Sequence, residues 1–395
     1  MIPRWDVPAF LRHLFHMRAE PARATISLGT VVLTELSANE DRSVMTDDNA
    51  MEAALTAVEA ASSSLSVMGR NGRAFMALPT DRKGAFHALK LYQPQRPKAV
   101  LAAAAIRVLA LWGLHRLFFP KIQHHGDLVA LDPPMSACLP GTAGVLLGSP
   151  EHPIRRAILS YETKDGWEVA KVAFGIAGKR VIETEAAALA AMPEFTRGIP
   201  RVLGIHHGEE FSILRLPNVH GETLTPRQGM RGMELLEAWI SDRPTRAACE
   251  FPEWEAIQTA LETSDAGKRA LDRIAPRQLR PVIRHGDFAR WNLLQRKDGT
   301  LIAIDWEWGH PAGMPGIDLV HVFAQDARLV FHLAPEAVVK AVEVELETPR
   351  CRQYLETCGW GDAARDAILA SIAFTVGTKQ QENERVLEAA LGIGR

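Results

Sequence analysis

The sequence predicts an α+β protein in which a small lobe of antiparallel strands precedes a mainly helical lobe. Three observations support this fold class. Apolar and polar side chains alternate along strand-like runs over residues 145–174, and an Asp-Gly pair at 165–166 is a strong hairpin signal. After residue 221 the apolar spacing lengthens to that of helices. The length of 395 residues suffices for about two to three domains of roughly 150 residues each.

Composition excludes several classes of function. The chain has 45 Lys and Arg against 47 Asp and Glu, a net charge of -2, so we expect no nucleic-acid partner. Its four cysteines form no CxxC pair, which predicts free thiols in a reducing compartment. Arg and His side chains interrupt the first twenty residues, which therefore lack the apolar run of a signal peptide. These features predict a cytoplasmic protein.

Residues 1–135 are expected to form an N-terminal region whose role the sequence does not reveal. Helical spacing predicts helices over Val7–Arg18 and Asn49–Ala61, and a strand-like run covers Ile26–Leu36. The polar, glycine-containing stretch Ser62–Asp81 is predicted to be a loop.

One segment of this region, Ala99–Phe119, is apolar over a length that would cross a bilayer. However, Arg107 and Arg116 fall on opposite faces of a helix, which leaves no side free of charge. The segment is therefore predicted to be a buried or half-buried helix. Peripheral membrane contact is left open as an alternative.

Residues 136–218 are predicted to form the strand-rich lobe and residues 219–395 the helical lobe with the catalytic loop. The first lobe is expected to contain strands at 145–147, 156–162, 168–174, 201–206 and 211–216, with a helix at 180–192 between the two groups. The second lobe is expected to begin with helices at 230–240, 253–261 and 267–274.

Two short strand-like runs interrupt the helical lobe, and polar motifs follow both. HGDFARWN covers His285–Asn292, and IDWEW covers Ile304–Trp308. Asp287, Asn292 and Asp305 thus supply a carboxylate, a carboxamide and a second carboxylate on neighbouring loops. Such oxygen atoms suit Mg²⁺, and one carboxylate remains to orient a hydroxyl group. This division of labour is what phosphoryl transfer requires.

HGDFARWNLL and IDWE, at this separation, resemble the motifs of the aminoglycoside phosphotransferase and choline kinase superfamily. The resemblance covers about Gly144 to the C-terminal helices and implies a two-lobed, protein-kinase-like fold, here preceded by an extra N-terminal region. It also implies that Asp287 is the catalytic acid/base that aligns the acceptor hydroxyl, and that Asn292 and Asp305 bind Mg²⁺. His285 is expected to support the loop.

The resemblance also implies a nucleotide grip in the first lobe. Lys171 alternates with apolar neighbours on a strand and would hold the α- and β-phosphates of ATP. Glu185 fits its helical partner better than Glu183 does. The adenine is expected near Arg215 and Leu216, where the lobes join.

Several residues keep alternative interpretations. Glu307 would reach metal or acceptor, or form a plain salt bridge. Asp318 would either hydrogen-bond back to the catalytic loop or cap a helix. Arg290 would face substrate or lie at the surface. The loop Gly148–Pro153 has one glycine and lacks the G-x-G-x-x-G pattern of protein kinases, and little room remains after Asp305 for an activation loop.

These features predict an ATP-dependent phosphotransferase that acts on a hydroxyl of a small molecule with Mg²⁺. The motif HGDFA-x-WN resembles kinase-like proteins associated with bacterial envelope polysaccharides, which favours a saccharide over choline or an antibiotic as acceptor. The rival hypothesis is a catalytically idle, kinase-like binding module whose N-terminal region engages a partner or a membrane.

Overall fold

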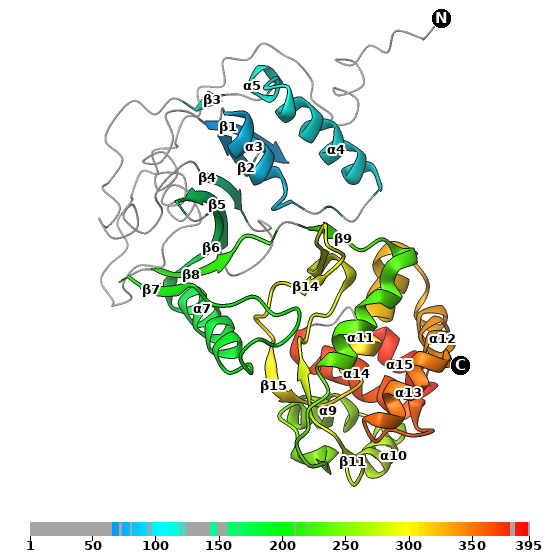
Figure 1. Ribbon diagram of the computed structural model, residues 1–395. Coiled ribbons are helices and arrows are strands. Elements are labelled where there is room, and N and C mark those ends of the chain that lie inside the picture. The colour runs from blue at the N-terminus through cyan, green and yellow to red at the C-terminus, as the bar shows by residue number, and fades with distance from the viewer. Residues whose placement is uncertain are drawn as a thin grey trace, which may run out of the picture.

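The chain forms two lobes, a sheet lobe and a helical lobe (Figure 1). This arrangement confirms the predicted fold class. The computed structural model describes residues 65–70, 73–79, 81–92, 94, 97–118, 121–122, 143–147, 156–164, 166–208, 211–219, 221–379 and 384–393. The elements expected before residue 62 and the loop Gly148–Pro153 lie outside these residues.

The sheet lobe is an antiparallel sheet whose described strands follow the order β3-β1-β2-β4-β5-β6-β8-β7. The predicted hairpin joins β5 to β6, with Thr163 opposite Gly166. The strands are β1 (Leu65–Arg70), β2 (Arg73–Pro79), β3 (Lys121–Ile122), β4 (Ala143–Leu147), β5 (Arg156–Thr163), β6 (Gly166–Phe174), β7 (Gly204–His207) and β8 (Phe211–Pro217).

The stretch Ser62–Asp81, predicted as a loop, instead contributes β1 and β2. Met76 and Leu78 alternate along β2 and are fully buried, which is the pattern of a half-buried strand. Gly69 coincides with a register shift in β1, so this glycine belongs to a bulge within the hairpin. The sheet therefore continues across the domain boundary predicted at residue 135.

Three helices follow this hairpin, namely α3 (Arg82–Leu89), α4 (Pro97–Leu111) and α5 (His115–Phe118). The Asp81 side chain begins α3 by accepting a hydrogen bond from the Gly84 N–H at 2.6 Å. The helix predicted over Ala99–Phe119 is split, because Gly113 between α4 and α5 has a φ of 70°. Within the described residues no helix combines the length and the hydrophobicity that a membrane span requires.

The buried face of α4 packs on α3 and β2 in a small core of its own that includes Met76, Leu89 and Ile106. Its outer face is also apolar, because Leu101, Trp112 of the following turn and Leu117 of α5 are exposed. The alternative of peripheral membrane contact therefore stays a prediction.

Helix α7 (Gly175–Ala190) completes the sheet lobe, and the chain enters the helical lobe after β8. The helices of this lobe are α8 (Met233–Ala238), α9 (Trp254–Leu261), α10 (Asp265–Ile274), α11 (Ile317–Gln325), α12 (Pro335–Leu346), α13 (Pro349–Thr357), α14 (Ala364–Lys379) and α15 (Glu384–Leu391). Its short strands are β9 (Glu222–Thr223), β10 (Arg246–Ala247), β11 (Gln278–Leu279), β12 (Val282–Arg284), β13 (Leu293–Gln295), β14 (Leu301–Ala303) and β15 (His310–Gly313).

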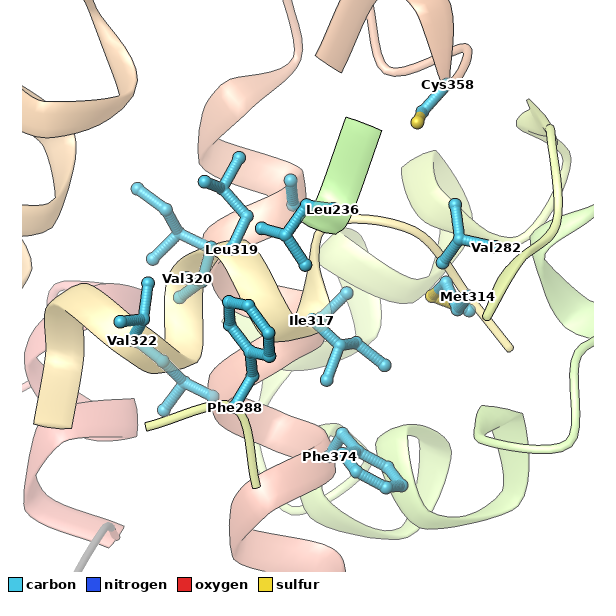
Figure 2. Packing of buried hydrophobic residues seen from close by; sticks show 14 of the residues in the cluster. Leu236, Val282, Phe288, Met314, Ile317, Leu319, Val320, Val322, Cys358 and Phe374 are labelled. Atoms are coloured by element: carbon cyan, nitrogen blue, oxygen red, sulfur yellow. The ribbon is translucent and has the colours of Figure 1, made fainter. Parts of the chain in front are cut away.

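The core of the helical lobe holds both motif loops in place. Phe288 of the first loop packs near Ile317 of α11 (Figure 2) and lies 5.5 Å from the ring of Trp239. Trp306 of the second loop contacts the same Trp239 ring at 5.2 Å. All three aromatic side chains are almost fully buried. Each motif thus carries one apolar anchor, and its polar residues are fixed relative to the core.

Candidate active site

The loop His285–Asn292 turns sharply where β12 ends. Gly286 has a φ of 80°, and a Cβ atom on it would lie 2.7 Å from the Trp308 carbonyl oxygen, so the turn needs glycine. The Asp318 carboxylate accepts hydrogen bonds from the backbone N–H groups of His285 (2.6 Å) and Gly286 (2.8 Å). Gly316 is the N-cap residue of α11, so Asp318 acts as the tie to the loop and not as the helix cap.

His285 is a buried, neutral support of this loop. Its Nε2–H donates to the Ile304 carbonyl oxygen at 2.8 Å, and its Nδ1 accepts from the Asp287 N–H at 3.2 Å. Both ring nitrogens are therefore used, and burial lowers the pKa of His285. These bonds join the first motif to the second.

The Asp287 carboxylate is held from two sides. Asn292 Nδ2 donates to the Asp287 carboxylate at 3.1 Å and to its backbone carbonyl at 2.9 Å. Because the amide nitrogen makes both bonds, the amide oxygen is the Asn292 atom that would face a cation. His321 Nε2 donates to the other carboxylate oxygen of Asp287 at 3.0 Å.

His321 was missed by the sequence analysis, although a signal exists. Asp318, His321 and Gln325 are spaced three and four residues apart on α11, and they follow one another along the side of the helix that meets the loop His285–Asn292. Asp318 binds the loop backbone, His321 binds Asp287, and the Gln325 amide lies 3.2 Å from His321 Nε2. Helical spacing downstream of Asp318 would have indicated His321.

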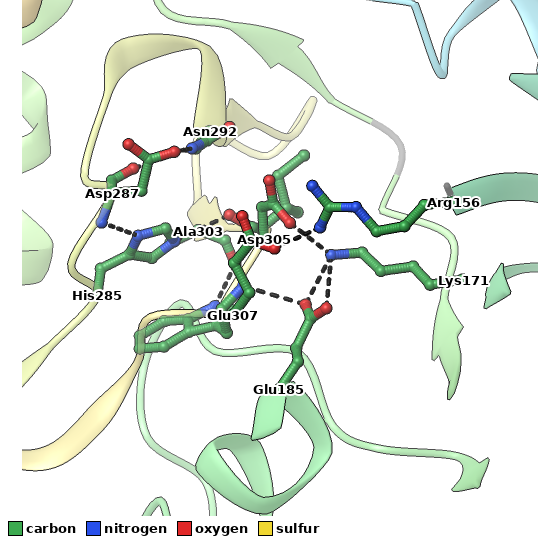
Figure 3. Close-up of polar contacts among 11 residues, drawn as sticks. Arg156, Lys171, Glu185, His285, Asp287, Asn292, Ala303, Asp305 and Glu307 are labelled. Atoms are coloured by element: carbon green, nitrogen blue, oxygen red, sulfur yellow. Dashed lines mark hydrogen bonds and ion pairs between the residues drawn. The ribbon is translucent and has the colours of Figure 1, made fainter. Parts of the chain in front are cut away.

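Lys171 bridges the two lobes (Figure 3). Its Nζ donates to the Glu185 carboxylate at 2.6 and 2.9 Å and to the Asp305 carboxylate at 2.7 Å. Glu185 also accepts from the Trp306 N–H at 3.0 Å. By contrast, Glu183 lies at the surface, where a His207 ring nitrogen is 3.5 Å away.

Charge and burial compete in this triad. Burial alone would lower the pKa of Lys171, but Asp305 and Glu185 outweigh it and raise that pKa. Burial would raise the pKa of Asp305, and the ammonium group holds it below its usual value. For Glu185, burial prevails and raises the pKa. Lys171 is therefore firmly charged, and the Asp305 carboxylate is its ionised partner.

Asp305 adopts a backbone conformation that is uncommon for a residue with a side chain. Its φ is 71°, in the left-handed region. The Ile304 N–H before it donates to the Asn292 carbonyl oxygen at 2.9 Å. This bond ties the two loops together, and Asn292 and Asp305 line the same cavity as Lys171.

The pair of Asn292 and Asp305 offers few protein oxygens to a metal. Across the residues that the structure describes, no cluster of three or more His, Cys, Asp or Glu side chains suits a metal ion. One carboxylate and one carboxamide nevertheless fit Mg²⁺, because that ion usually keeps several waters and shares phosphate oxygens.

Arg156 is a second residue that the sequence analysis missed. It begins β5 and forms an ion pair with Glu307 of the second motif, across the two lobes. Glu307 therefore follows the salt-bridge alternative. The carboxylates of Glu307 and Asp305 offset the burial of Arg156 and raise its pKa. This guanidinium thus lies beside the Lys171 triad.

A cavity of about 340 Å³ lies between the lobes next to this triad. Ile158 and Val169 line it from the sheet lobe, and Leu294 and Ile304 line it from the helical lobe. Its remaining lining residues are Lys90, Leu91, Tyr92, Leu146, Lys171, Pro200, Leu216, Pro217, Asn218, Val219, Gly221, Trp291, Asn292 and Asp305. An apolar slot that ends at a lysine matches the shape of a nucleotide site.

Leu216 and Arg215 differ in their relation to this cavity. Leu216 lines it, as predicted. The Arg215 side chain instead donates to Glu168 at 2.8 Å and to the Tyr161 hydroxyl at 3.0 Å. Successive side chains of a strand point to opposite faces, so Arg215 of β8 is turned away from the slot that Leu216 faces. The expectation that the adenine lies near Arg215 and Leu216 therefore concerns the backbone of Arg215 and not its side chain, and it stays a prediction.

Neither alternative for Arg290 holds. Its side chain is buried and donates to Asp326 at 3.1 Å and to the Leu224 carbonyl oxygen at 2.6 Å. Arg290 therefore faces neither substrate nor solvent. Burial raises the pKa of Asp326, and the guanidinium partly offsets this effect.

Comparison with known proteins finds a family match for part of the chain. Residues 179–347 match the model of a phosphotransferase enzyme family. This segment includes Glu185, Asp287, Asn292 and Asp305, and it begins after Lys171. No curated protein sequence matches the chain significantly.

Solved structures of low similarity include three kinases. The aminoglycoside phosphotransferase APH(4)-Ia is 14% identical, with a TM-score of 0.43, over 63% of this chain and 90% of that one. A choline kinase from Cryptosporidium parvum is 13% identical, with a TM-score of 0.39, over 63% and 87%. The spectinomycin phosphotransferase APH(9)-Ia is 14% identical, with a TM-score of 0.36, over 64% and 88%.

Proposed function

We propose that the protein transfers the γ-phosphate of ATP to a hydroxyl group of a small molecule, because residues 179–347 match the model of a phosphotransferase enzyme family. The family agrees with the predicted enzyme class, a small-molecule kinase. The observation that carries the proposal is the contact of Lys171 with both Glu185 and Asp305 at the end of an apolar cavity. A buried lysine held by a helical glutamate is the arrangement that grips nucleotide phosphates.

In this proposal the nucleotide base occupies the apolar part of the cavity. Leu216 and Ile304 line this cavity from opposite lobes and would pack on the two faces of the base. Lys171 would then reach the phosphates. Its present bond to Asp305 at 2.7 Å occupies that carboxylate, so metal and phosphate would replace the Lys171–Asp305 contact when ATP binds.

The proposed cation is Mg²⁺, and Asn292 and Asp305 are the residues that would hold it. When bound, it would neutralise charge on the phosphates. The contribution of the chain is to keep Asn292 oriented, which the two hydrogen bonds from its amide nitrogen to Asp287 accomplish.

Asp287 is the proposed catalytic acid/base. Its carboxylate would accept the hydrogen bond of the acceptor hydroxyl and hold the oxygen in line with the transferring phosphate. Asn292 and His321 fix that carboxylate from two sides, so its orientation is set before the acceptor arrives. His321 is therefore a positioning residue in this proposal.

A saccharide is the proposed acceptor. This choice is based on the motif HGDFA-x-WN at His285–Asn292 and on its resemblance to kinase-like proteins of envelope polysaccharides. Trp308, two residues after the Trp306 anchor, is partly exposed beside the loop and offers an aromatic face for a sugar ring. Of the other tryptophans, Trp306 of the same motif and Trp239 of α8's C-terminal end are buried in the core, and Trp291 of the first motif lines the cavity proposed for the nucleotide.

The test combines ligand binding with turnover. Thermal unfolding of the full chain is measured with and without ATP and Mg²⁺, and ATP consumption is then screened over sugars and amino alcohols. We expect ATP to raise the melting temperature and one class of acceptor to be phosphorylated. Asp287→Asn should keep the ATP-induced shift and lower kcat by about 10²–10⁴-fold, because it removes the acid/base.

The matched control is Asp242→Asn, which neutralises an exposed carboxylate in the same lobe. It should turn over like the wild type. Full turnover by Asp287→Asn would refute the assigned role. An ATP-induced shift without turnover of any acceptor would instead favour the idle binding module.

A further inference from the structure

The end of α3 forms one side of the cavity between the lobes. Lys90, Leu91 and Tyr92 all line it. They precede the family match at residues 179–347 by a wide margin, and they belong to the N-terminal region whose role the sequence did not reveal. We call these three residues the α3 wall.

The α3 wall is held in place by contacts of α3 with strands β4 and β6 of the sheet lobe. Ala88 of α3 packs directly on Gly144 of β4, where a Cβ atom would lie only 2.0 Å from the Ala88 Cβ. The His87 ring stacks on the Trp167 ring of β6 with centroids 4.0 Å apart and an interplanar angle of 2°. β6 also carries Lys171, so α3 and the lysine share one support.

Helix α4 fastens the wall from the other side. Arg107 Nη2 donates to the backbone carbonyl oxygens of Tyr92 at 3.1 Å and of Leu89 at 3.4 Å. Two hydrogen bonds from one guanidinium close the end of α3, where carbonyl groups lack helical partners. Leu91 and Tyr92 also pack on the small core that α3 shares with α4.

Positive charge gathers at this side of the cavity. Burial lowers the pKa of Lys90, and the charges of Lys297 and Arg107 lower it further, so all three cations lie near one another. Burial lowers the pKa of Arg107, and the negative charge of Glu222, which neighbours the cavity residue Gly221, partly offsets this effect. Lys90 and Lys171 line the same cavity, so the α3 wall adds a second cation to it, and this charge favours an anionic ligand.

We propose that the α3 wall is part of the nucleotide site: Leu91 and Tyr92 cover the nucleotide at the open side of the cavity, and the Lys90 ammonium attracts its phosphate-bearing form. This inference rests on the proposed function, because it takes ATP as the ligand. It gives the N-terminal region a role in substrate binding that the family-matched segment does not contain.

The test compares two ligands on the full-length chain. Dissociation constants for ATP with Mg²⁺ and for adenosine are measured by calorimetry for the wild type, Lys90→Gln and Tyr92→Ala. Lys90→Gln should weaken ATP binding about fivefold and adenosine binding less than about twofold, because only ATP is charged. Tyr92→Ala should weaken both ligands by about fivefold, because it removes apolar contact area.

Lys83→Gln is the matched control, since Lys83 lies on the same helix with an exposed side chain. It should bind both ligands like the wild type. Thermal unfolding without nucleotide verifies that each variant is folded, and Lys90→Gln keeps the test decisive if Tyr92→Ala is unstable.

The outcomes separate this inference from the proposed function. If Lys90→Gln and Tyr92→Ala both bound ATP with wild-type affinity, the proposed role of the α3 wall would be refuted, while the proposed function would stand. Equal losses in Lys90→Gln and Lys83→Gln would also overturn that role, because the effect would not be local. Failure of the wild type to bind ATP would overturn both proposals.

Discussion

The ammonium group of Lys171 is shared by two carboxylates, and the two differ in how easily a phosphate group would displace them. The ammonium lies 2.6 Å from Glu185 and 2.7 Å from Asp305. Glu185 is fully buried and keeps a backbone bond to Trp306, whereas Asp305 is the more exposed of the two partners. In the proposed function a phosphate group would therefore displace Asp305 from Lys171 more easily than Glu185, and Asp305 would then be available to Mg²⁺.

Arg290 shows that a charged residue inside a motif need not face the ligand. The sequence left substrate contact and surface exposure open, yet the guanidinium forms a buried ion pair with Asp326. Its position two residues before Asn292 made a functional role attractive. The pairing depends on Asp326, 36 residues downstream, which no local pattern reveals.

Arg290→Met should therefore destabilise the fold in a pH-dependent way. Removing the cation leaves Asp326 buried and unpaired, which should lower the free energy of unfolding by about 3–5 kcal/mol at neutral pH. The pKa of Asp326 is already raised by burial and should rise further. A carboxyl group whose folded-state pKa is raised costs stability as the pH rises from its unfolded pKa to its folded pKa, so the loss should be smaller at about pH 5 than at about pH 7.5.

Urea unfolding of Arg290→Met at both pH values measures this effect. Arg350→Met is the control, because Arg350 forms a bidentate but exposed pair with Glu237 at 2.6 and 2.7 Å. It should cost at most about 1 kcal/mol and show no such pH dependence. A loss in Arg290→Met that grows towards acidic pH would contradict the assignment.

At the scale of elements, the contact between α3 and β4 links the N-terminal hairpin to the active-site sheet. Gly144 is buried and faces Ala88, so β4 approaches α3 more closely than any larger residue would permit. The same strand supplies Leu146 to the cavity. A displacement of α3 should therefore lower the stability of the sheet lobe and also move the α3 wall.

Gly144→Val tests this link. Its side chain would collide with α3, so we expect a loss of about 1–3 kcal/mol in the free energy of unfolding. The variant should also bind ATP more weakly, because the α3 wall moves with its helix. Gly204→Val on β7 is the control, since no atom lies within 4 Å of the Cβ position there. Calorimetry measures the ATP affinity of both variants, and thermal unfolding measures their stability. Equal changes in the two variants would rule out the contact between Gly144 and α3 as the cause.

At the scale of the molecule, the sequence predicts best what local patterns encode. The β5–β6 hairpin follows from an Asp-Gly pair. The two motif loops were identified from their spacing. The sequence pattern does not reveal β1 and β2, because glycine and polar residues interrupt this hairpin. The burial of β2 depends on contacts with helices α3 and α4. The sequence does not reveal the role of Arg156, because its partner Glu307 lies far away in the chain, whereas His321 does have a local signal in its spacing from Asp318 on α11.

The same long-range packing decides whether the kinase-like part can stand alone. β2 pairs with β4 through Met76 opposite Leu146 and Ala77 opposite Val145. Val145 is fully buried within this arrangement. Cutting the chain at the predicted boundary of residue 135 would turn β4 into an exposed, apolar edge strand.

We therefore expect a chain of residues 136–395 to be less stable than the full-length protein. Size-exclusion chromatography should show association through the open edge of β4, thermal unfolding should begin at a lower temperature, and ATP affinity should fall because the α3 wall is absent. The full-length chain under the same conditions is the reference. If the shortened chain were monomeric, melted at the same temperature and bound ATP equally well, the boundary at residue 135 would be a true domain boundary. The N-terminal strands would then be an attachment to a complete kinase-like fold and not part of its sheet and nucleotide site.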